Sequence, residues 1–254
     1  MSINEVFPNP TVKKVIFQIK FPNLFFIEKR IGEFQLKIMN EFPESSLLFR
    51  RQVVFVDTGP EGKLENIPAE LDNEKGKKIW QFTSPKGYKL NVLSDSLDIT
   101  SEFHKTYNNH QSDNRFRDII KLVFDSFSEI VAVPIKISRI GLRYIDECPI
   151  VSKNNRSFRL YYNSVFPLSR FNLSDAEEMD FKTVVRKGDY FLRYVESIRK
   201  IDEENKLILD FDAYAVDVTS ENCLAATDTL HDLILEEYVK TIKEPVYRYM
   251  RRRG

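Results

Sequence analysis

Glycine is scarce in this chain, with 8 residues in 254, and the phosphate-binding motifs GxGxxG and GxxxxGK[ST] do not occur. Such loops need glycine because backbone amides approach the phosphate closely in conformations that side chains resist. The motifs HExxH and GxSxG, typical of zinc proteases and serine hydrolases, are also missing. The sequence therefore favours a protein with no catalytic activity and no cofactor, although catalytic groups can converge from distant positions.

Cysteine and long hydrophobic runs are scarce too. Cys148 and Cys223 are the only cysteines, and neither belongs to a CxxC pair, so we expect no metal site. No apolar run reaches the ~20 residues that a membrane helix needs. The opening segment MSINEVFPNP lacks the basic and apolar regions of a secretory signal. These features predict a soluble, cytoplasmic protein with reduced thiols and no membrane contact.

The formal net charge of the chain at pH 7 is zero, because 38 lysines and arginines balance 38 acidic residues. A balanced chain has no general attraction to nucleic acid, so nucleic-acid binding is disfavoured as a function. The C-terminal segment YRYMRRRG is a local exception, since arginine and tyrosine together can bind and stack on bases. We favour the simpler interpretation that this segment is a frayed, solvated terminus.

Aromatic residues are abundant, with 20 Phe and 11 Tyr, and the apolar residues recur with two different periods. Alternation at Val15, Phe17 and Ile19 predicts a half-buried strand, and similar segments predict strands at 47–57, 78–84, 88–102, 134–146, 183–187, 190–200 and 206–217. Spacings of three and four predict amphipathic helices over residues 24–42, 113–130 and 226–242.

The order of these elements predicts an α+β fold. Residues 1–133 and 134–254 each contain antiparallel strands followed by one long helix. We therefore expect two related halves that share one continuous, curved sheet, with the helices packed on one face. Identity between the halves is slight, so the duplication is an inference from the order of elements.

The segment RIGLRYID places Arg139, Gly141 and Arg143 on one face of a strand. The absent side chain of Gly141 would leave a gap between two guanidinium groups, which could hold a phosphate or carboxylate, with Tyr144 beside it. The alternative, which we favour, is that both arginines pair with acidic residues on neighbouring strands.

A hairpin in the second half offers such acidic residues. If residues 202–205 form a four-residue loop, Arg199 lies diagonal to Asp210 and Arg193 lies diagonal to Asp212 on the same face. The two aspartates would then form structural ion pairs. A metal site at the aspartates is disfavoured because no third carboxylate or histidine is close in the sequence.

The three histidines fit no catalytic pattern. His104 and His110 fall in or near a polar loop, and His231 lies early in the last helix. An Asp–His contact with Asp228 or Asp232 is one interpretation. We favour the other, in which the acids stabilise the N-terminus of the helix.

Four segments, NPTVKKVIFQIKF, RIGLRYID, LDFDAY and TLHDLILEEYVKTI, resemble in this order an uncharacterised prokaryotic protein family of similar length. Its members are sporadically distributed among bacteria and archaea, and Arg-x-Gly-Leu-Arg-Tyr is the most specific part of the resemblance. Asn is common in the family where this chain has Asp146. The family has no assigned activity, so the resemblance implies no catalytic residue. Sporadic distribution implies mobile genes, such as phage-defence or toxin-neutralising operons.

Two functions follow as expectations. The first is a non-catalytic protein-interaction module in a prokaryotic defence or toxin-control complex, with a protein partner or a second copy of the chain. The alternative is a protein of the cavity type, either binding or enzymatic, that holds a small anionic ligand with Arg139 and Arg143.

Overall fold

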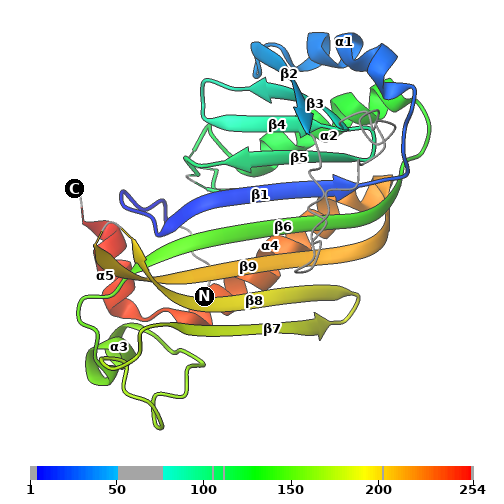
Figure 1. The fold of residues 1–254 in the computed structure, drawn as a ribbon. Helices are drawn as coiled ribbons and strands as arrows, with labels where there is room; N and C mark the ends of the chain where they lie inside the picture. Colours follow the sequence, from blue (N-terminus) through cyan, green and yellow to red (C-terminus); the bar gives the residue numbers. More distant parts are fainter. Residues whose placement is uncertain (1–4, 51–76, 105, 111, 202, 253–254) are drawn as a thin grey trace, which may run out of the picture.

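The computed structural model of this protein describes residues 5–50, 77–104, 106–110, 112–201 and 203–252. These residues contain a nine-stranded antiparallel sheet in the order β2-β3-β4-β5-β1-β6-β9-β8-β7 (Figure 1). The strands are β1 (Val12–Lys20), β2 (Glu44–Arg50), β3 (Lys77–Thr83), β4 (Tyr88–Val92), β5 (Ser96–Ser101), β6 (Lys136–Pro149), β7 (Met179–Lys187), β8 (Tyr190–Ile201) and β9 (Glu204–Thr219). The prediction of a mixed α and β fold built on antiparallel strands is confirmed.

Five α-helices accompany the sheet in the part of the chain that is described. They are α1 (Ile27–Ile38), α2 (Phe116–Val131), α3 (Asn155–Tyr161), α4 (Cys223–Thr241) and α5 (Glu244–Arg251). The three helices predicted from apolar spacing correspond to α1, α2 and α4, with ends that differ by a few residues. The short helices α3 and α5 were not predicted, because neither segment is long enough to show helical periodicity.

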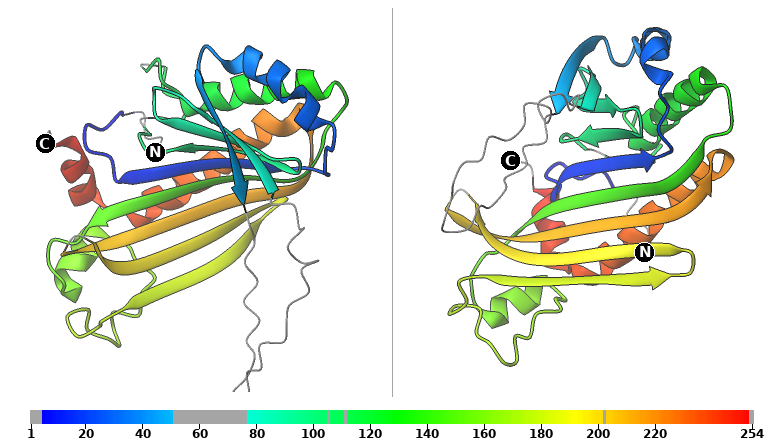
Figure 2. Two further views of the ribbon diagram at one scale, coloured as in Figure 1. Left: turned by 45° about the horizontal axis from the view of Figure 1, so that its top comes forward. Right: turned by 45° about the vertical axis from the view of Figure 1, so that its right-hand side comes forward.

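The hydrophobic core lies between one face of the sheet and the long helices. On β1, Val15, Phe17 and Ile19 are fully buried, whereas the alternate residues face the other side. Phe34 of α1 meets Phe82 of β3 and Phe127 of α2, with ring centroids 5.9 and 5.8 Å apart. Figure 2 shows α1, α2 and α4 on the same side of the sheet.

The long helix α4 covers the second half of the sheet. It packs on β9, β6 and β8 and buries Ala226, Leu230 and Ile234 against them. Figure 1 shows α4 running behind β6 and β9, so the two strands and the helix form one wall of the molecule. This placement brings Tyr238 of α4 close to Thr11, in the segment that precedes β1.

Residues 247–251 of the C-terminal segment belong to helix α5, which differs from the frayed terminus that was expected. Val246 and Met250 of α5 are buried, and the backbone N–H of Asn9 donates to the carbonyl of Met250 at 3.0 Å. Arg251 also pairs with Glu5 at 2.9 Å. The helix is stabilised by contacts with the N-terminal part of the chain, which local sequence patterns do not reveal.

Two further outcomes concern the strands and the membrane. Strand β2 begins at Glu44, three residues before the predicted strand at 47–57, and the end of that prediction lies outside the described residues. No helix among the described residues is both long and apolar enough to cross a membrane.

Candidate functional site

The arginines of the RIGLRYID segment lie on the face of β6 opposite the helices. The guanidinium of Arg139 folds over Gly141 and donates to the carboxylate of Asp212 at 3.0 Å, while its Cζ lies 4.8 Å from the Tyr214 ring centroid. A Cβ built on Gly141 would lie only 2.6 Å from Nη1 of Arg139. The expected gap at Gly141 is therefore filled by Arg139 itself, which leaves no space there for a phosphate or carboxylate.

Arg143 is held by the next strand in the same way. Its Nε and Nη2 donate to the two oxygens of Asp210 at 2.7 and 2.8 Å, and Arg193 of β8 donates to the same carboxylate at 3.1 Å. The side chain of Asp210 is 11% exposed, so this carboxylate joins β6, β9 and β8 in a partly buried network.

The hairpin between β8 and β9 has a tighter turn than expected. Ile201 faces Glu204, and Glu203 adopts the left-handed backbone conformation with φ of 66°. The register therefore shifts by two residues relative to the expected four-residue loop. Arg193 consequently lies directly opposite Asp212, and Arg199 lies opposite Lys206. Arg199 bonds to Glu178 and Asp180, near β7, and not to Asp210.

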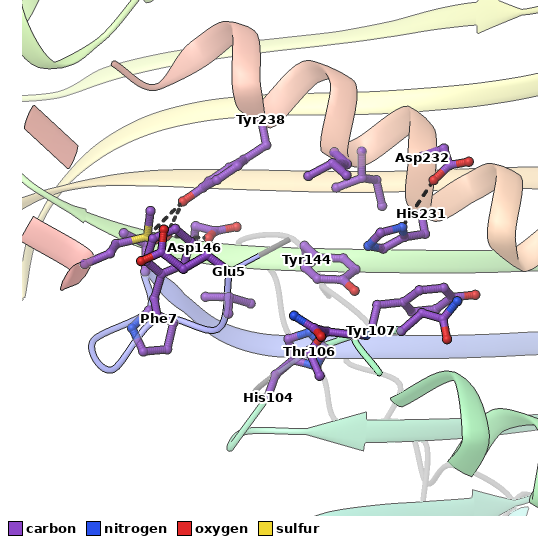
Figure 3. A pocket seen from close by; sticks show the side chains of 18 of the residues that line it. Glu5, Phe7, His104, Thr106, Tyr107, Tyr144, Asp146, His231, Asp232 and Tyr238 are labelled. Atoms are coloured by element: carbon purple, nitrogen blue, oxygen red, sulfur yellow. Dashed lines mark hydrogen bonds and ion pairs between the residues drawn. The ribbon is translucent and has the colours of Figure 1, made fainter. Parts of the chain in front are cut away.

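A cavity of about 510 Å³ lies on the other side of the sheet, beneath α4. Its walls come from the N-terminal segment, the chain after β5, strand β6 and helices α4 and α5 (Figure 3). This volume is within the range of small-molecule binding sites, about 300–1,000 Å³. Tyr144 is the one speculative ligand-binding residue from the sequence that lines it, because Tyr144 points to the opposite face from Arg139 and Arg143.

At one end of the cavity, three side chains form a hydrogen-bonded chain. Thr11 Oγ1 donates to Asp146 Oδ1 at 2.8 Å and lies 2.6 Å from the hydroxyl of Tyr238. Either hydroxyl can donate in the Thr11–Tyr238 contact, and the Tyr238 hydroxyl also donates to Sδ of Met250 at 3.5 Å. Strand β6, helix α4 and the segment before β1 are thereby joined at the carboxyl group.

Asp146 is an unusual carboxyl group because it is 3% exposed. Burial raises its pKa to about 7, while the hydrogen bond from Thr11 and the charge of Lys13 act in the opposite direction. Among the described residues no cation forms an ion pair with it. The group therefore exchanges its proton close to neutral pH, a property that is concentrated at functional sites.

Two polar atoms in the cavity wall have no hydrogen-bond partner in the described part of the chain. They are the hydroxyl of Tyr144 and Nδ1 of His104, and both residues are at least nine-tenths buried. Burial lowers the pKa of His104 to about 3, so its ring is neutral at neutral pH. An unpaired buried polar atom costs about 1–3 kcal/mol.

The other end of the cavity is aromatic. The ring of Tyr107 stacks on His231 of α4, with centroids 4.1 Å apart and planes 10° apart. The Tyr107 hydroxyl donates to Asp228 at 2.7 Å, and Arg117 of α2 holds the same carboxylate with two bonds of 2.7 and 2.8 Å. These bonds fix the chain after β5 between α2 and α4.

Of the two Asp–His contacts that the sequence offered as the less favoured interpretation, the structure shows one. His231 Nδ1 lies 3.5 Å from Asp232, whereas Asp228 is bound by Arg117 and Tyr107. Burial is the main cause that lowers the pKa of His231, and the charges of the two aspartates act against it. The described His, Cys, Asp and Glu side chains form no group of three or more that could hold a metal ion.

Sequence patterns did not reveal this cavity. Asp146 lies 135 positions after Thr11 in the sequence, and Tyr238 lies 227 positions after Thr11. The available signal was Asp146 itself, an acidic residue at an inward position of a buried strand, where an unpaired charge is costly. No protein-family model, curated protein or solved structure matches this chain.

Proposed function

We propose that this chain is a small-molecule-binding protein and that its ligand occupies the cavity beneath α4. The observation that carries the proposal is a 510 Å³ cavity whose wall includes polar and titratable side chains. Tyr144 and His104 contribute polar atoms without protein partners among the described residues, and Asp146 contributes a buried carboxyl group. A purely structural interior would be filled with apolar side chains, since each unpaired group destabilises the fold.

The proposal keeps the cavity type of function expected from the sequence but moves the site to other residues. Arg139 and Arg143 already bind Asp212 and Asp210, and they lie on the opposite face of the sheet. Their pairing supports a structural role, in which they join β6 to β9. The ligand would instead contact Tyr144, Asp146 and the flank of α4.

A fragment screen by ligand-detected NMR tests this proposal. Leu235 of α4 lines the cavity and is partly exposed, so Leu235→Trp should fill the entrance. Leu233 is partly exposed on the same helix but does not line the cavity, and Leu233→Trp is the matched control. We expect fragments that bind the wild type and the control but not Leu235→Trp. The proposal would be contradicted if a library with equal numbers of cationic, neutral and anionic fragments contained no fragment that binds Leu233→Trp but not Leu235→Trp.

We further infer that residues 1–133 and 134–254 are two related halves. In each half the first strand is followed by a helix and then by a meander, and the last strand of the meander pairs with the first strand. Thus β5 pairs with β1 and β9 pairs with β6, and a long helix follows each meander. The cavity would then lie where the halves meet, with Thr11 and Tyr107 from one half and Asp146 and His231 from the other.

Protein interaction is the second candidate function, and exposed apolar residues on β2, which is an edge strand of the sheet formed by the described residues, support it. Leu47, Leu48 and Phe49 are 46%, 42% and 62% exposed. Edge strands with such residues readily pair with another strand. We propose that the partner is β2 of a second copy, antiparallel about Leu47, because this register packs Leu47 on itself and covers the exposed stretch in both chains.

Light scattering coupled to size exclusion tests this second candidate. The wild type should form a dimer as its concentration rises, and Phe49→Lys should remain monomeric. Val184→Lys, on the edge strand β7 and with a residue that is 50% exposed, should behave like the wild type. A wild-type chain that stays monomeric at high concentration would contradict the second candidate.

A further inference from the structure

The charges around the cavity indicate which ligand it accepts. Its wall contains the acidic residues Glu5, Asp146, Asp228 and Asp232, and no lysine or arginine among the described residues lines it. Inorganic phosphate or an organic carboxylate would find acidic side chains in this wall and no lysine or arginine among its lining residues to bind. Anions, the ligand class that the sequence offered as an alternative, therefore fit this cavity poorly.

Three of the four acidic residues already have positively charged or titratable partners. Glu5 pairs with Arg251 at 2.9 Å, Asp228 pairs with Arg117 at 2.7 Å, and Asp232 lies 3.5 Å from His231. Asp146 differs because its hydrogen bond comes from the neutral hydroxyl of Thr11. Among the described residues Asp146 is therefore the buried acid of this wall that has no ion-pair partner, whereas Asp232 is exposed to solvent.

The surroundings of Asp146 combine the hydroxyl groups of Thr11 and Tyr238 with apolar and aromatic side chains. Phe7, Tyr238 and Met250 line the same end of the cavity, and Figure 3 shows the Asp146 carboxyl group beside Phe7 and the Tyr238 hydroxyl. A carboxylate with aromatic rings around it is a favourable environment for a cation, because the faces of the rings also attract positive charge. The aromatic end at Tyr107 and Tyr144 could contact the apolar body of the same ligand.

We propose that the ligand of this cavity is a small organic cation, namely a protonated amine with an apolar or flat body, whose nitrogen pairs with Asp146. This inference rests on the proposed small-molecule function and specifies its ligand class. The amine donates to the carboxylate of Asp146, and its body occupies the cavity toward Tyr144. The pair would supply the charge partner that the described residues do not provide.

The inference links binding to pH. Titratable groups near Asp146 are Tyr144 and Cys148 on β6, Tyr238 on α4 and Lys13 on β1. Burial raises the pKa of the two tyrosines and of the cysteine, so these groups stay neutral at neutral pH. The carboxyl group has a pKa of about 7 without ligand. Because the cation needs the ionised form, its affinity should rise about tenfold per pH unit below pH 7 and level off above it.

Three probes of one shape test the ligand class by NMR titration. These are phenethylamine, 2-phenylethanol and 3-phenylpropanoate, which carry a positive, a neutral and a negative group on the same phenyl body. At pH 8 we expect phenethylamine to bind at least tenfold more tightly than 2-phenylethanol, which corresponds to about 1.4 kcal/mol. We expect no binding of 3-phenylpropanoate.

Two variants complete the test. Asp146→Asn should reduce phenethylamine to the affinity of 2-phenylethanol and remove the pH dependence, while the affinity of 2-phenylethanol stays constant and shows that the cavity is intact. Asp232→Asn, at an exposed acid of the same wall, should keep the preference for the amine.

Other outcomes separate the two proposals. Equal or tighter binding of 3-phenylpropanoate, or a preference for phenethylamine that survives in Asp146→Asn, overturns the ligand class and leaves the small-molecule function standing. Failure of all three probes also overturns the ligand class if the fragment screen has identified cavity ligands. If the screen is blank as well, both proposals are overturned.

Discussion

Replacement of the buried carboxyl group in Asp146→Asn should change how stability depends on pH. In the native state the pKa of Asp146 is about 7, against an ordinary value of 3.8. The native state thus holds this proton more tightly than the unfolded chain does. Between pH 4 and pH 7 the free energy of unfolding therefore falls as pH rises, because ionisation is disfavoured in the folded protein.

The size of the effect follows from the pKa difference. Each pKa unit corresponds to about 1.4 kcal/mol, so full ionisation of Asp146 destabilises the fold by about 4 kcal/mol. Between pH 5 and pH 8 the change is about 2–3 kcal/mol. The amide introduced by Asp146→Asn would retain an oxygen that accepts from Thr11 and would have no proton to lose. The variant should therefore gain stability relative to the wild type by this amount as pH rises.

Titration of His104 changes the free energy of unfolding with pH in the opposite direction. The pH dependence of wild-type stability alone therefore does not isolate the contribution of Asp146. Burial lowers the pKa of His104 from 6.5 to about 3, so its contribution to stability is fully present above pH 6.5 and is lost as pH falls toward 3. The two groups partly cancel between pH 5 and pH 7. Subtracting the wild type from Asp146→Asn removes the His104 contribution, because that residue is present in both proteins.

Urea unfolding at several pH values, without ligand, measures the difference. Glu147→Gln removes a negative charge from the neighbouring residue, which is half-buried, and controls for the change in net charge. We expect a steep pH dependence of the difference for Asp146→Asn and a much smaller one for the control. A difference for Asp146→Asn that does not vary with pH would refute the reasoning about the buried carboxyl group.

Further predictions concern the arginine network and the core. Asp210→Asn should lower the free energy of urea unfolding by about 2 kcal/mol, because two guanidinium groups lose their carboxylate, whereas Arg199→Ala, at a side chain 48% exposed, should cost less than ~1 kcal/mol. Equal losses would contradict a special role for the network. Gly141→Ala should lower the stability measured by thermal unfolding by about 1 kcal/mol, because its Cβ displaces the Arg139 guanidinium, 2.6 Å away. Gly32→Ala should raise the stability by up to about 1 kcal/mol, because the new Cβ on α1 meets open space. A stabilised Gly141→Ala protein would show that the guanidinium moves freely. Phe127→Ala should destabilise by about 3–5 kcal/mol, since it removes a fully buried ring, and a loss under ~1 kcal/mol would mean that the core repacks.

Local patterns predicted the main elements well because their signals are periodic. Alternation at Val15, Phe17 and Ile19 corresponds to β1, and the apolar stripes correspond to α1, α2 and α4. The same alternation correctly grouped Arg139, Gly141 and Arg143 on one face. Side-chain direction in a strand has a period of two, so the grouping needs no knowledge of the neighbouring strands.

Strand register could not be predicted as well. The β8–β9 hairpin depends on Glu203, which adopts a positive φ that is uncommon for a residue other than glycine. Nothing in the sequence marks this conformation, so a longer loop was expected and the partners of Arg193 and Arg199 shifted. Helix α5 is a similar case, because its order depends on contacts with residues near the other end of the chain, such as Glu5 and Asn9.

The sequence by itself determined most of the strands, the long helices α1, α2 and α4 and the composition of each strand face, because these depend on the spacing of apolar residues along the chain. Only the tertiary structure decided where the polar residues meet. It brought Asp146 to Thr11 and Tyr238, placed His231 on Tyr107, and closed the gap at Gly141 with Arg139. Those contacts depend on how the strands and α4 pack together, and packing joins residues that carry no mark of one another in the sequence.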